Sequence, residues 1–169
     1  MILHIYPERV SLQMTKQGPM DLKAAEPVVI AICCLAIIAA LVLGVGLATN
    51  LVLRHIVQTA PLWIGVILGF RHSRAASWVT FPLFLVWLIL MALIWLYLLG
   101  LSNLLSGHFA PVEIAMTIIV GAAAIVGIAG FIRFKSSLSP IKAGGIFVLM
   151  LAIQLACLRV SFLPAIGHR

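Results

Sequence analysis

Four long apolar runs, separated by short polar segments, dominate the chain. They cover residues 27–46, 78–99, 111–132 and 143–163. Because a helix rises 1.5 Å per residue, about twenty apolar residues cross the roughly 30 Å of hydrocarbon in a bilayer. The pattern therefore predicts four membrane-spanning helices. Pro27 and Pro111 stand at the starts of two of them, each near an acidic residue, as is favoured at helix N-termini.

The run over residues 51–70 is ambiguous because Arg54, His55 and Gln58 interrupt its first half. If Arg54 extends back to the interface, the run is long enough to span. Otherwise only about fifteen apolar residues remain, which favours a re-entrant or interfacial helix. Pro61 predicts a kink in either case. The expected fold class is all-α, a polytopic transmembrane helical bundle of five spans, with four spans plus one re-entrant or interfacial helix as the alternative.

This division predicts three segments. Residues 1–26 form a cytoplasmic N-terminal tail with only short apolar stretches. Met14 and Met20 are alternative starts, and a start at Met20 predicts that residues 1–19 are disordered. Residues 27–163 form a single transmembrane helical domain, and residues 164–169 a short C-terminal tail. No charged start, apolar core and small-residue cleavage site follow one another as in a signal peptide.

Composition excludes both an ordinary soluble protein and a disordered one. Of the 169 residues, 64% are hydrophobic and 9% are charged, and the mean hydropathy is +1.24; soluble domains average about 25% charged residues. The four acidic residues lie outside the middles of the apolar runs, which argues against a proton relay and against paired-carboxylate hydrolysis. With no metal-ligand spacing and no phosphate loop, we expect no enzyme activity, no metal and no cofactor.

The basic residues favour the arrangement with five spans. In that arrangement eight Lys and Arg residues share one side of the membrane and three lie on the other, whereas four spans give six against five. Loops on the cytoplasmic side carry the excess of positive charge. We therefore expect a cytoplasmic N-terminus, and we expect the bacterial inner membrane because the chain carries no transit peptide.

Basic residues of two loops are expected to meet on the cytoplasmic face. They are Arg71, His72, Arg74, Arg133, Lys135 and Lys142. Anionic lipid headgroups, at about 1 kcal/mol per basic residue, are the expected ligands, with an acidic loop of a partner protein as an alternative and simple control of membrane orientation as the plainest interpretation. A nucleic-acid partner is not expected, since no continuous basic face carries aromatic residues.

A second polar site is expected near the outer face. Arg54 and Gln58 are one helical turn apart, so their side chains share a face and would contact a small anion or a headgroup. His55 and His108 would be the pair for a haem iron, but we expect them at the interface, in contact with water. Gln154 is the deepest polar residue and is expected to bond a neighbouring helix.

Small residues predict which helices pack closely. One stripe, in the first run, comprises Ala36, Ala40, Gly44 and Ala48, and another, in residues 111–132, comprises Gly121, Ala124, Gly127 and Gly130. Small residues let backbones approach in lipid. The run over 78–99 has almost none, so we expect the first, third and fourth long runs to pack together and 78–99 to face lipid or a partner.

The sequence favours a non-catalytic function. The leading hypothesis is an accessory, assembly or scaffold subunit of a membrane complex, whose partners are anionic lipids and other membrane subunits or further copies of the chain. The alternative is a small oligomeric transporter or channel for an uncharged or anionic solute. The scarcity of polar groups at depth favours the first, and the span of large residues over 78–99 would be its docking face.

Overall fold

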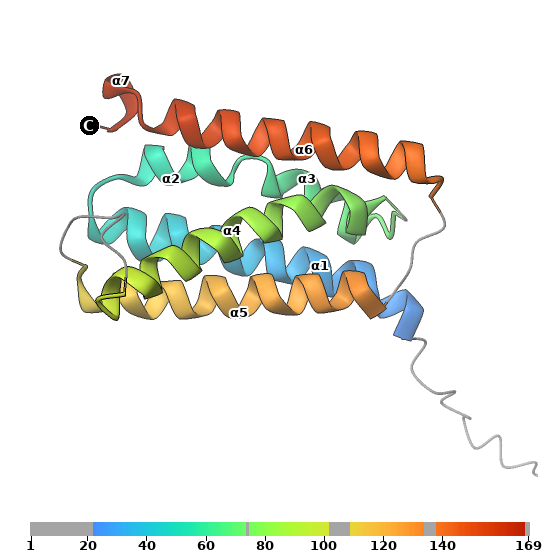
Figure 1. Ribbon diagram of the computed structural model, residues 1–169, viewed down its shortest axis with the longest axis horizontal. Coiled ribbons are helices and arrows are strands. Elements are labelled where there is room, and N and C mark those ends of the chain that lie inside the picture. Colours follow the sequence, from blue (N-terminus) through green and yellow to red (C-terminus); the bar gives the residue numbers. More distant parts are fainter. Residues whose placement is uncertain (1–21, 74, 102–108, 134–137, 168–169) are drawn as a thin grey trace, which may run out of the picture.

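A bundle of long helices makes up the part of the chain that the computed structural model describes, which is residues 22–73, 75–101, 109–133 and 138–167 (Figure 1). Its elements are α1 (Leu22–Ala39), the π-helix η1 (Ala40–Gly46), α2 (Val52–Thr59), α3 (Leu62–Phe70), α4 (Ala76–Leu98), α5 (Pro111–Arg133), α6 (Pro140–Ser161) and the short α7 (Pro164–Gly167). No strand occurs within these ranges. The predicted all-α membrane bundle is thus confirmed.

Four of the elements are long and apolar enough to cross a membrane, and the pair α2–α3 supplies up to one more span. This pair is bent by 55° where α2 gives way to α3, so the kink predicted at Pro61 is confirmed; proline lacks the N–H that would continue the helix. The pair runs from the end of the bundle where η1 stops to the end where α4 starts (Figure 1).

Helix bounds differ from the predicted ones by up to five residues. The first helix begins at Leu22, so Pro27 lies inside it rather than at its start. The reason is local, since residues 22–26 are mostly strong helix formers that extend the helix backwards. The last long helix begins at Pro140 and ends at Ser161, whereas 143–163 was expected.

The expectation that residues 78–99 present their large side chains to lipid or to a partner, rather than to the other helices, is wrong. In α4, ten residues are buried, among them Leu83, Phe84 and Trp87, and the helix packs against α5, α6, α3 and α1. Large side chains of α4 fit onto small residues of its neighbours: the ring of Phe84 lies directly over Gly127 of α5. Two helices pack closely in lipid when one of the two residues in each contact is small. Here α4 contributes the large residue and the neighbouring helix contributes the small one.

The small residues of the first predicted stripe, in α1 and η1, do not share one face of the helix. Ala40 is buried and Gly44 lies against Met116 of α5, but Ala36 is half-buried and Ala48 is exposed. Residues 40–46 form a π-helix, in which hydrogen bonds join residues five apart. Positions four apart therefore rotate out of register along this segment.

The second stripe, on α5, points in several directions. Ala124 and Gly127 are buried, Gly121 is near Met91, and Gly130 faces open space. α5 packs on α4 and on α1, but α6 packs on α4 and α2 instead. The three helices rich in small residues consequently do not form one packed group, as had been expected.

Two glycines of α3, in the ambiguous run, lie close against neighbouring helices, and one of them lies against backbone atoms of α1. A Cβ atom built on Gly69 would lie 2.5 Å from the carbonyl oxygen of Pro27 and 2.8 Å from Cβ of Ala31, both in α1. One built on Gly65 would meet Thr80 and, at 2.8 Å, the Cys34 sulfur. Four residues separate the two glycines, the spacing of small residues that lets membrane helices approach closely.

Candidate functional site

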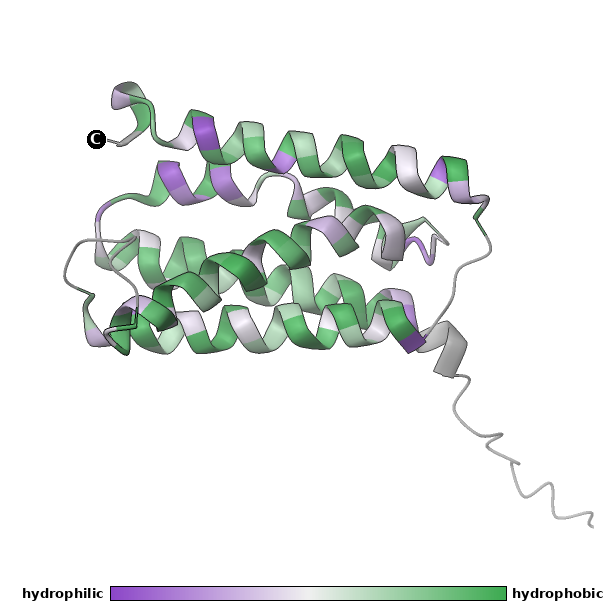
Figure 2. Ribbon diagram, in the orientation of Figure 1, coloured by the Kyte–Doolittle hydropathy of each residue, from purple (hydrophilic) through white to green (hydrophobic). Residues whose placement is uncertain are grey.

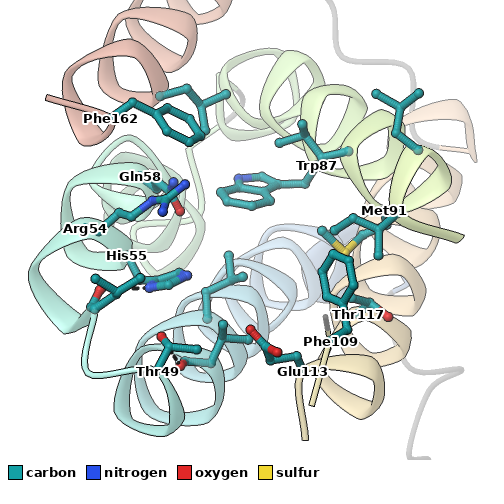
Figure 3. A pocket seen from close by; sticks show the side chains of 17 residues that line it. Thr49, Arg54, His55, Gln58, Trp87, Met91, Phe109, Glu113, Thr117 and Phe162 are labelled. Carbon is teal, nitrogen blue, oxygen red and sulfur yellow. Dashed lines mark hydrogen bonds between the residues drawn. The ribbon is translucent and has the colours of Figure 1, made fainter. Parts of the chain in front are cut away.

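A cavity of about 550 Å³ opens at the end of the bundle where η1 and α4 stop and α2 and α5 begin (Figure 3). Its walls come from α2, η1, α4, α5 and α6. The polar side chains around it are Thr49, Arg54, His55, Gln58, Trp87, Glu113 and Thr117. Most of the other lining residues are aliphatic or aromatic, so a few polar groups stand in an apolar chamber, as in many ligand sites.

Helix α2 presents its polar residues to this cavity. Arg54, His55 and Gln58 occupy positions that share one helical face, while Leu53 and Ile56 are exposed on the opposite side. Figure 3 shows the three polar side chains directed toward the space between the helices. Arg54 and Gln58 were expected to share a face, and the structure places both in the cavity wall.

The guanidinium of Arg54 is incompletely satisfied. Its Cζ lies 4.2 Å from the centroid of the Phe162 ring, a cation–π contact. Its buried Nε atom has no hydrogen-bond partner among the residues that the structure describes. A donor of this kind, removed from water and left unpaired, is costly unless another group accepts its proton.

Trp87 presents a second unpaired donor to the same cavity. The side chain is 3% exposed, and its Nε1 atom lacks a partner within the described ranges. In Figure 3 the indole extends into the space opposite Arg54. The sequence pattern does not connect Trp87 with Arg54, since the two belong to different helices.

His55 is buried, at 9% exposure, whereas an interfacial position in contact with water had been expected. Its Nδ1 lies 2.9 Å from the carbonyl oxygen of Leu51. Because that carbonyl only accepts, Nδ1 carries a proton and donates it, and in the neutral ring Nε2 is the acceptor. His108, the other half of the haem hypothesis, lies outside the described residues.

Glu113 also lines the cavity, at the start of α5. Its Oε2 accepts a hydrogen bond of 2.6 Å from the backbone N–H of Ala110. A carboxylate in the first turn also complements the positive end of the helix dipole. Glu113 is therefore held by its own helix, unlike Arg54 on the facing wall.

A hydrogen-bonded network joins α2 to α6 beside the cavity. Gln58 Nε2 donates to Ser161 Oγ at 3.0 Å, and Ser161 Oγ donates to the Leu158 carbonyl at 2.7 Å. Gln154, fully buried, donates from Nε2 to the backbone carbonyl of Gln58 at 3.0 Å. The expected bond from Gln154 to a neighbouring helix is thus confirmed, and it stabilises α2 next to its bend.

The other end of the bundle is basic. Arg71 and His72, at the end of α3, and Arg133 and Lys142, on α5 and α6, are all exposed. Figure 1 shows the end of α3, the end of α5 and the start of α6 at this same end, and Figure 2 shows polar residues there. Arg74 and Lys135 lie outside the described residues.

Two observations define what the cavity offers chemically. It is lined by Arg54 and Trp87, each of which carries a buried N–H donor without a partner among the described residues, and its remaining surface is mostly apolar. Within the described ranges, no group of three or more His, Cys, Asp or Glu side chains is placed to hold a metal ion. No family model, no curated protein and no solved structure matches this chain, so the cavity is interpreted from its own residues.

Proposed function

We propose that this chain is a small, non-catalytic integral membrane protein that binds an anionic solute in the cavity between α2, η1 and α4 and transports it. The observation that carries the proposal is the pair of unpaired donors, Arg54 Nε and Trp87 Nε1, on two side chains that line one cavity from opposite sides. An oxyanion between them would accept from both. Charge-assisted hydrogen bonds to a guanidinium are among the strongest in proteins.

Charge supports an anion over a neutral solute. Arg54 forms no ion pair with the described residues, and it stands in the first turn of α2, where the helix dipole is also positive. A cation partly removed from water is stabilised by a nearby negative charge far more than at the surface. The only acid in the cavity wall, Glu113, is engaged at the start of its own helix.

Irregular helices border the cavity, which supports transport over static binding. The π-helix η1 supplies Leu41 and Val45, and the bent pair contributes Arg54 and Gln58 close to its break. Interrupted helices line the substrate sites of many transporters, and π-helical turns occur often at functional sites. Two such elements beside one cavity give the bundle places where it can bend.

An accessory, assembly or scaffold subunit is the competing proposal. It is favoured by the wide exposed apolar faces of α5 and α6, which include Ile118, Ile125, Val148 and Leu155. In lipid such faces contact either acyl chains or other subunits. Affinity purification in mild detergent separates the proposals: stoichiometric foreign subunits support the accessory role, and purification of the chain alone or as a self-oligomer supports transport.

Replacing Arg54 with Gln is expected to lower anion uptake at least tenfold. The change removes the charge while keeping a polar side chain, and a hydrogen bond to a charged group contributes about 1.5–3 kcal/mol, where 1.4 kcal/mol corresponds to tenfold. The measurement is the initial uptake of radiolabelled benzenesulfonate, a permanently charged organic anion, into proteoliposomes. The matched control is Arg159→Gln, which alters an exposed arginine of α6 outside the cavity wall. Uptake by wild type no faster than in protein-free vesicles would refute transport of this anion.

We further propose the bacterial inner membrane, with the N-terminus and the basic end in the cytoplasm and the cavity on the outer side. Positive loops favour the cytoplasm, where anionic headgroups would contact Arg71, His72, Arg133 and Lys142, together with Arg74 and Lys135.

Labelling with a membrane-impermeant maleimide tests this orientation in a Cys157→Ser background, since Cys33 and Cys34 are buried. We expect Ala165→Cys to be labelled in intact cells and Ser139→Cys only after the cells are permeabilised. The reverse pattern would contradict the proposed orientation.

A further inference from the structure

We propose that the ligand of this cavity is an amphiphile with one monoanionic oxyanion headgroup and a long apolar chain. This inference rests on the proposed function and names the class of ligand. The headgroup is placed between Arg54 and Trp87, and the chain lies along the apolar walls of α4, η1 and α6. Three features of the cavity carry it: the position of the donors, the composition of the walls and the divergence of α4 from α6.

The headgroup position follows from the two unpaired donors. Trp87 is almost fully buried, so water reaches its Nε1 poorly, and an indole N–H in such a place normally has an acceptor. The Arg54 guanidinium is held over the Phe162 ring, which orients its planar fork of donors toward a carboxylate or phosphate oxygen. One oxyanion placed between the two side chains would accept from both donors.

The charge balance selects a monoanion. Arg54 and Glu113 are the formally charged side chains that line the cavity among the described residues, and the Glu113 carboxylate accepts from the backbone N–H of Ala110, so the Arg54 guanidinium is the charge in the wall without an ion-pair partner. One negative charge on the ligand compensates Arg54. A dianionic headgroup would add a second charge in a chamber of low polarity that already holds the Glu113 carboxylate, and like charges repel strongly there.

The walls select an apolar chain behind the headgroup. Leu41 and Val45 line one side, Leu90 and Ile94 another, and Leu158 a third. A small hydrophilic anion would leave this surface in contact with trapped water, whereas an acyl chain covers it and removes the apolar area from water. A volume of about 550 Å³ is in the range of sites for drug-sized ligands.

The helices α4 and α6, which flank the cavity, separate toward the end of the bundle at which the ligand's apolar chain would leave it. Near the basic end, α4 and α6 are joined by Phe81 and Phe147, whose ring centroids are 5.9 Å apart. Toward the cavity the two helices diverge (Figure 1), and the cavity is lined by Leu93 of α4 and by Phe162, which is 63% exposed. An acyl chain would therefore reach the surrounding lipid between α4 and α6.

Fluorescence quenching of Trp87 tests the inference. The variant Trp63→Phe/Trp78→Phe/Trp95→Phe leaves Trp87 as the only tryptophan. It is placed in phosphatidylcholine nanodiscs and titrated with 9,10-dibromostearate in one arm, and brominated phosphatidylglycerol replaces part of the lipid in the other. We expect quenching that saturates at one ligand per chain, is reversed by the unbrominated compound and is not reversed by stearyl alcohol, which has no charge.

The two arms separate the sources of the headgroup. Saturation with dibromostearate alone supports a free fatty-acid-like carboxylate, and saturation with phosphatidylglycerol alone supports a phosphodiester of a membrane lipid. In either case Arg54→Gln is expected to weaken binding at least tenfold, while Arg159→Gln leaves it within twofold. Quenching that does not saturate in either arm, or equal affinity of Arg54→Gln and wild type, overturns the inference.

A second measurement guards against loss of folding in the triple tryptophan variant. Native mass spectrometry of the wild-type chain in detergent counts stearate or phosphatidylglycerol adducts, which we expect at one per chain and lost in Arg54→Gln. The outcomes also separate this inference from the proposed function. Saturable binding without benzenesulfonate uptake keeps the amphiphile site and refutes transport of that anion, and uptake without amphiphile binding keeps transport and refutes the amphiphile.

Discussion

Replacing Gly69 with Leu is expected to lower the melting temperature in detergent by about 10 °C. The new Cβ alone would lie 2.5 Å from the carbonyl oxygen of Pro27 and 3.0 Å from the amide nitrogen of Ala31, both backbone atoms of α1. Backbone atoms do not rotate away as a side chain does, so α3 and α1 have to separate. Overpacking costs about 1–3 kcal/mol and more when the backbone shifts, and about 3 kcal/mol corresponds to roughly 10 °C at this chain length.

Two further glycine variants make the comparison specific. Gly130→Leu adds the same side chain to α5 at a position with open space around it, so we expect a change of no more than about 2 °C. Gly127→Leu meets the buried ring of Phe84, which is a side chain rather than backbone, so an intermediate loss is expected. Equal melting temperatures for all three variants would show that close approach of α3 and α1 does not stabilise the bundle. The measurement is loss of the folded state followed by tryptophan fluorescence on heating.

Replacing Gln154 with Leu is expected to destabilise the bundle by about 2 kcal/mol. The side chain donates to the Gln58 carbonyl just before the bend, where Pro61 contributes no N–H and Ala60 pairs with Val57 in a tighter turn. Without Gln154 that carbonyl is buried and loses its side-chain donor. Side-chain hydrogen bonds between membrane helices average about 0.6 kcal/mol, and an unsatisfied buried carbonyl costs about 1–3 kcal/mol. Gln154 Oε1, a buried acceptor without a partner among the described residues, leaves with the substitution and offsets part of this cost, which keeps the net loss near about 2 kcal/mol rather than above it.

A control and a double-mutant cycle identify the cause. Thr80→Val removes a buried hydroxyl that bonds only within its own helix, to Ala76, and is expected to cost less than about 1 kcal/mol. In a Pro61→Ala background, in which α2 and α3 can straighten, the loss caused by Gln154→Leu should shrink. Urea unfolding in mild detergent measures all four proteins of the cycle. A loss that is the same in both backgrounds would mean that Gln154 does not act through the bend.

The local features of the membrane spans were predictable because each depends on residues near one another in the chain. The kink at Pro61, the span over residues 111–132 and the shared face of Arg54 and Gln58 all follow from the chemistry and the period of a single helix. The missed signal was also local: Gly65 and Gly69 have the spacing of a close helix contact. The polar residues of α2 made the run over residues 51–70 ambiguous, whereas the two glycines lie in its apolar half.

The partners of each helix were not predictable in the same way. Small residues marked surfaces suited to close packing, but they did not show that the large side chains of α4 would fill them. The meeting of Arg54, Trp87 and Glu113 around one cavity likewise depends on how α2, α4 and α5 are arranged. These residues are up to 59 positions apart, and no periodicity relates helices at that separation.

By itself, the amino-acid sequence determined that this protein lies in a membrane, that it is helical and which of its segments are long enough to span. Hydrocarbon offers no partners to backbone N–H and C=O groups, so long apolar runs have to satisfy those groups within helices. Only the tertiary structure decided which side chains remain unpaired inside the bundle. Helices in lipid choose their neighbours by shape rather than by burial of apolar surface, so the position of Arg54 opposite Trp87 comes from packing of whole helices.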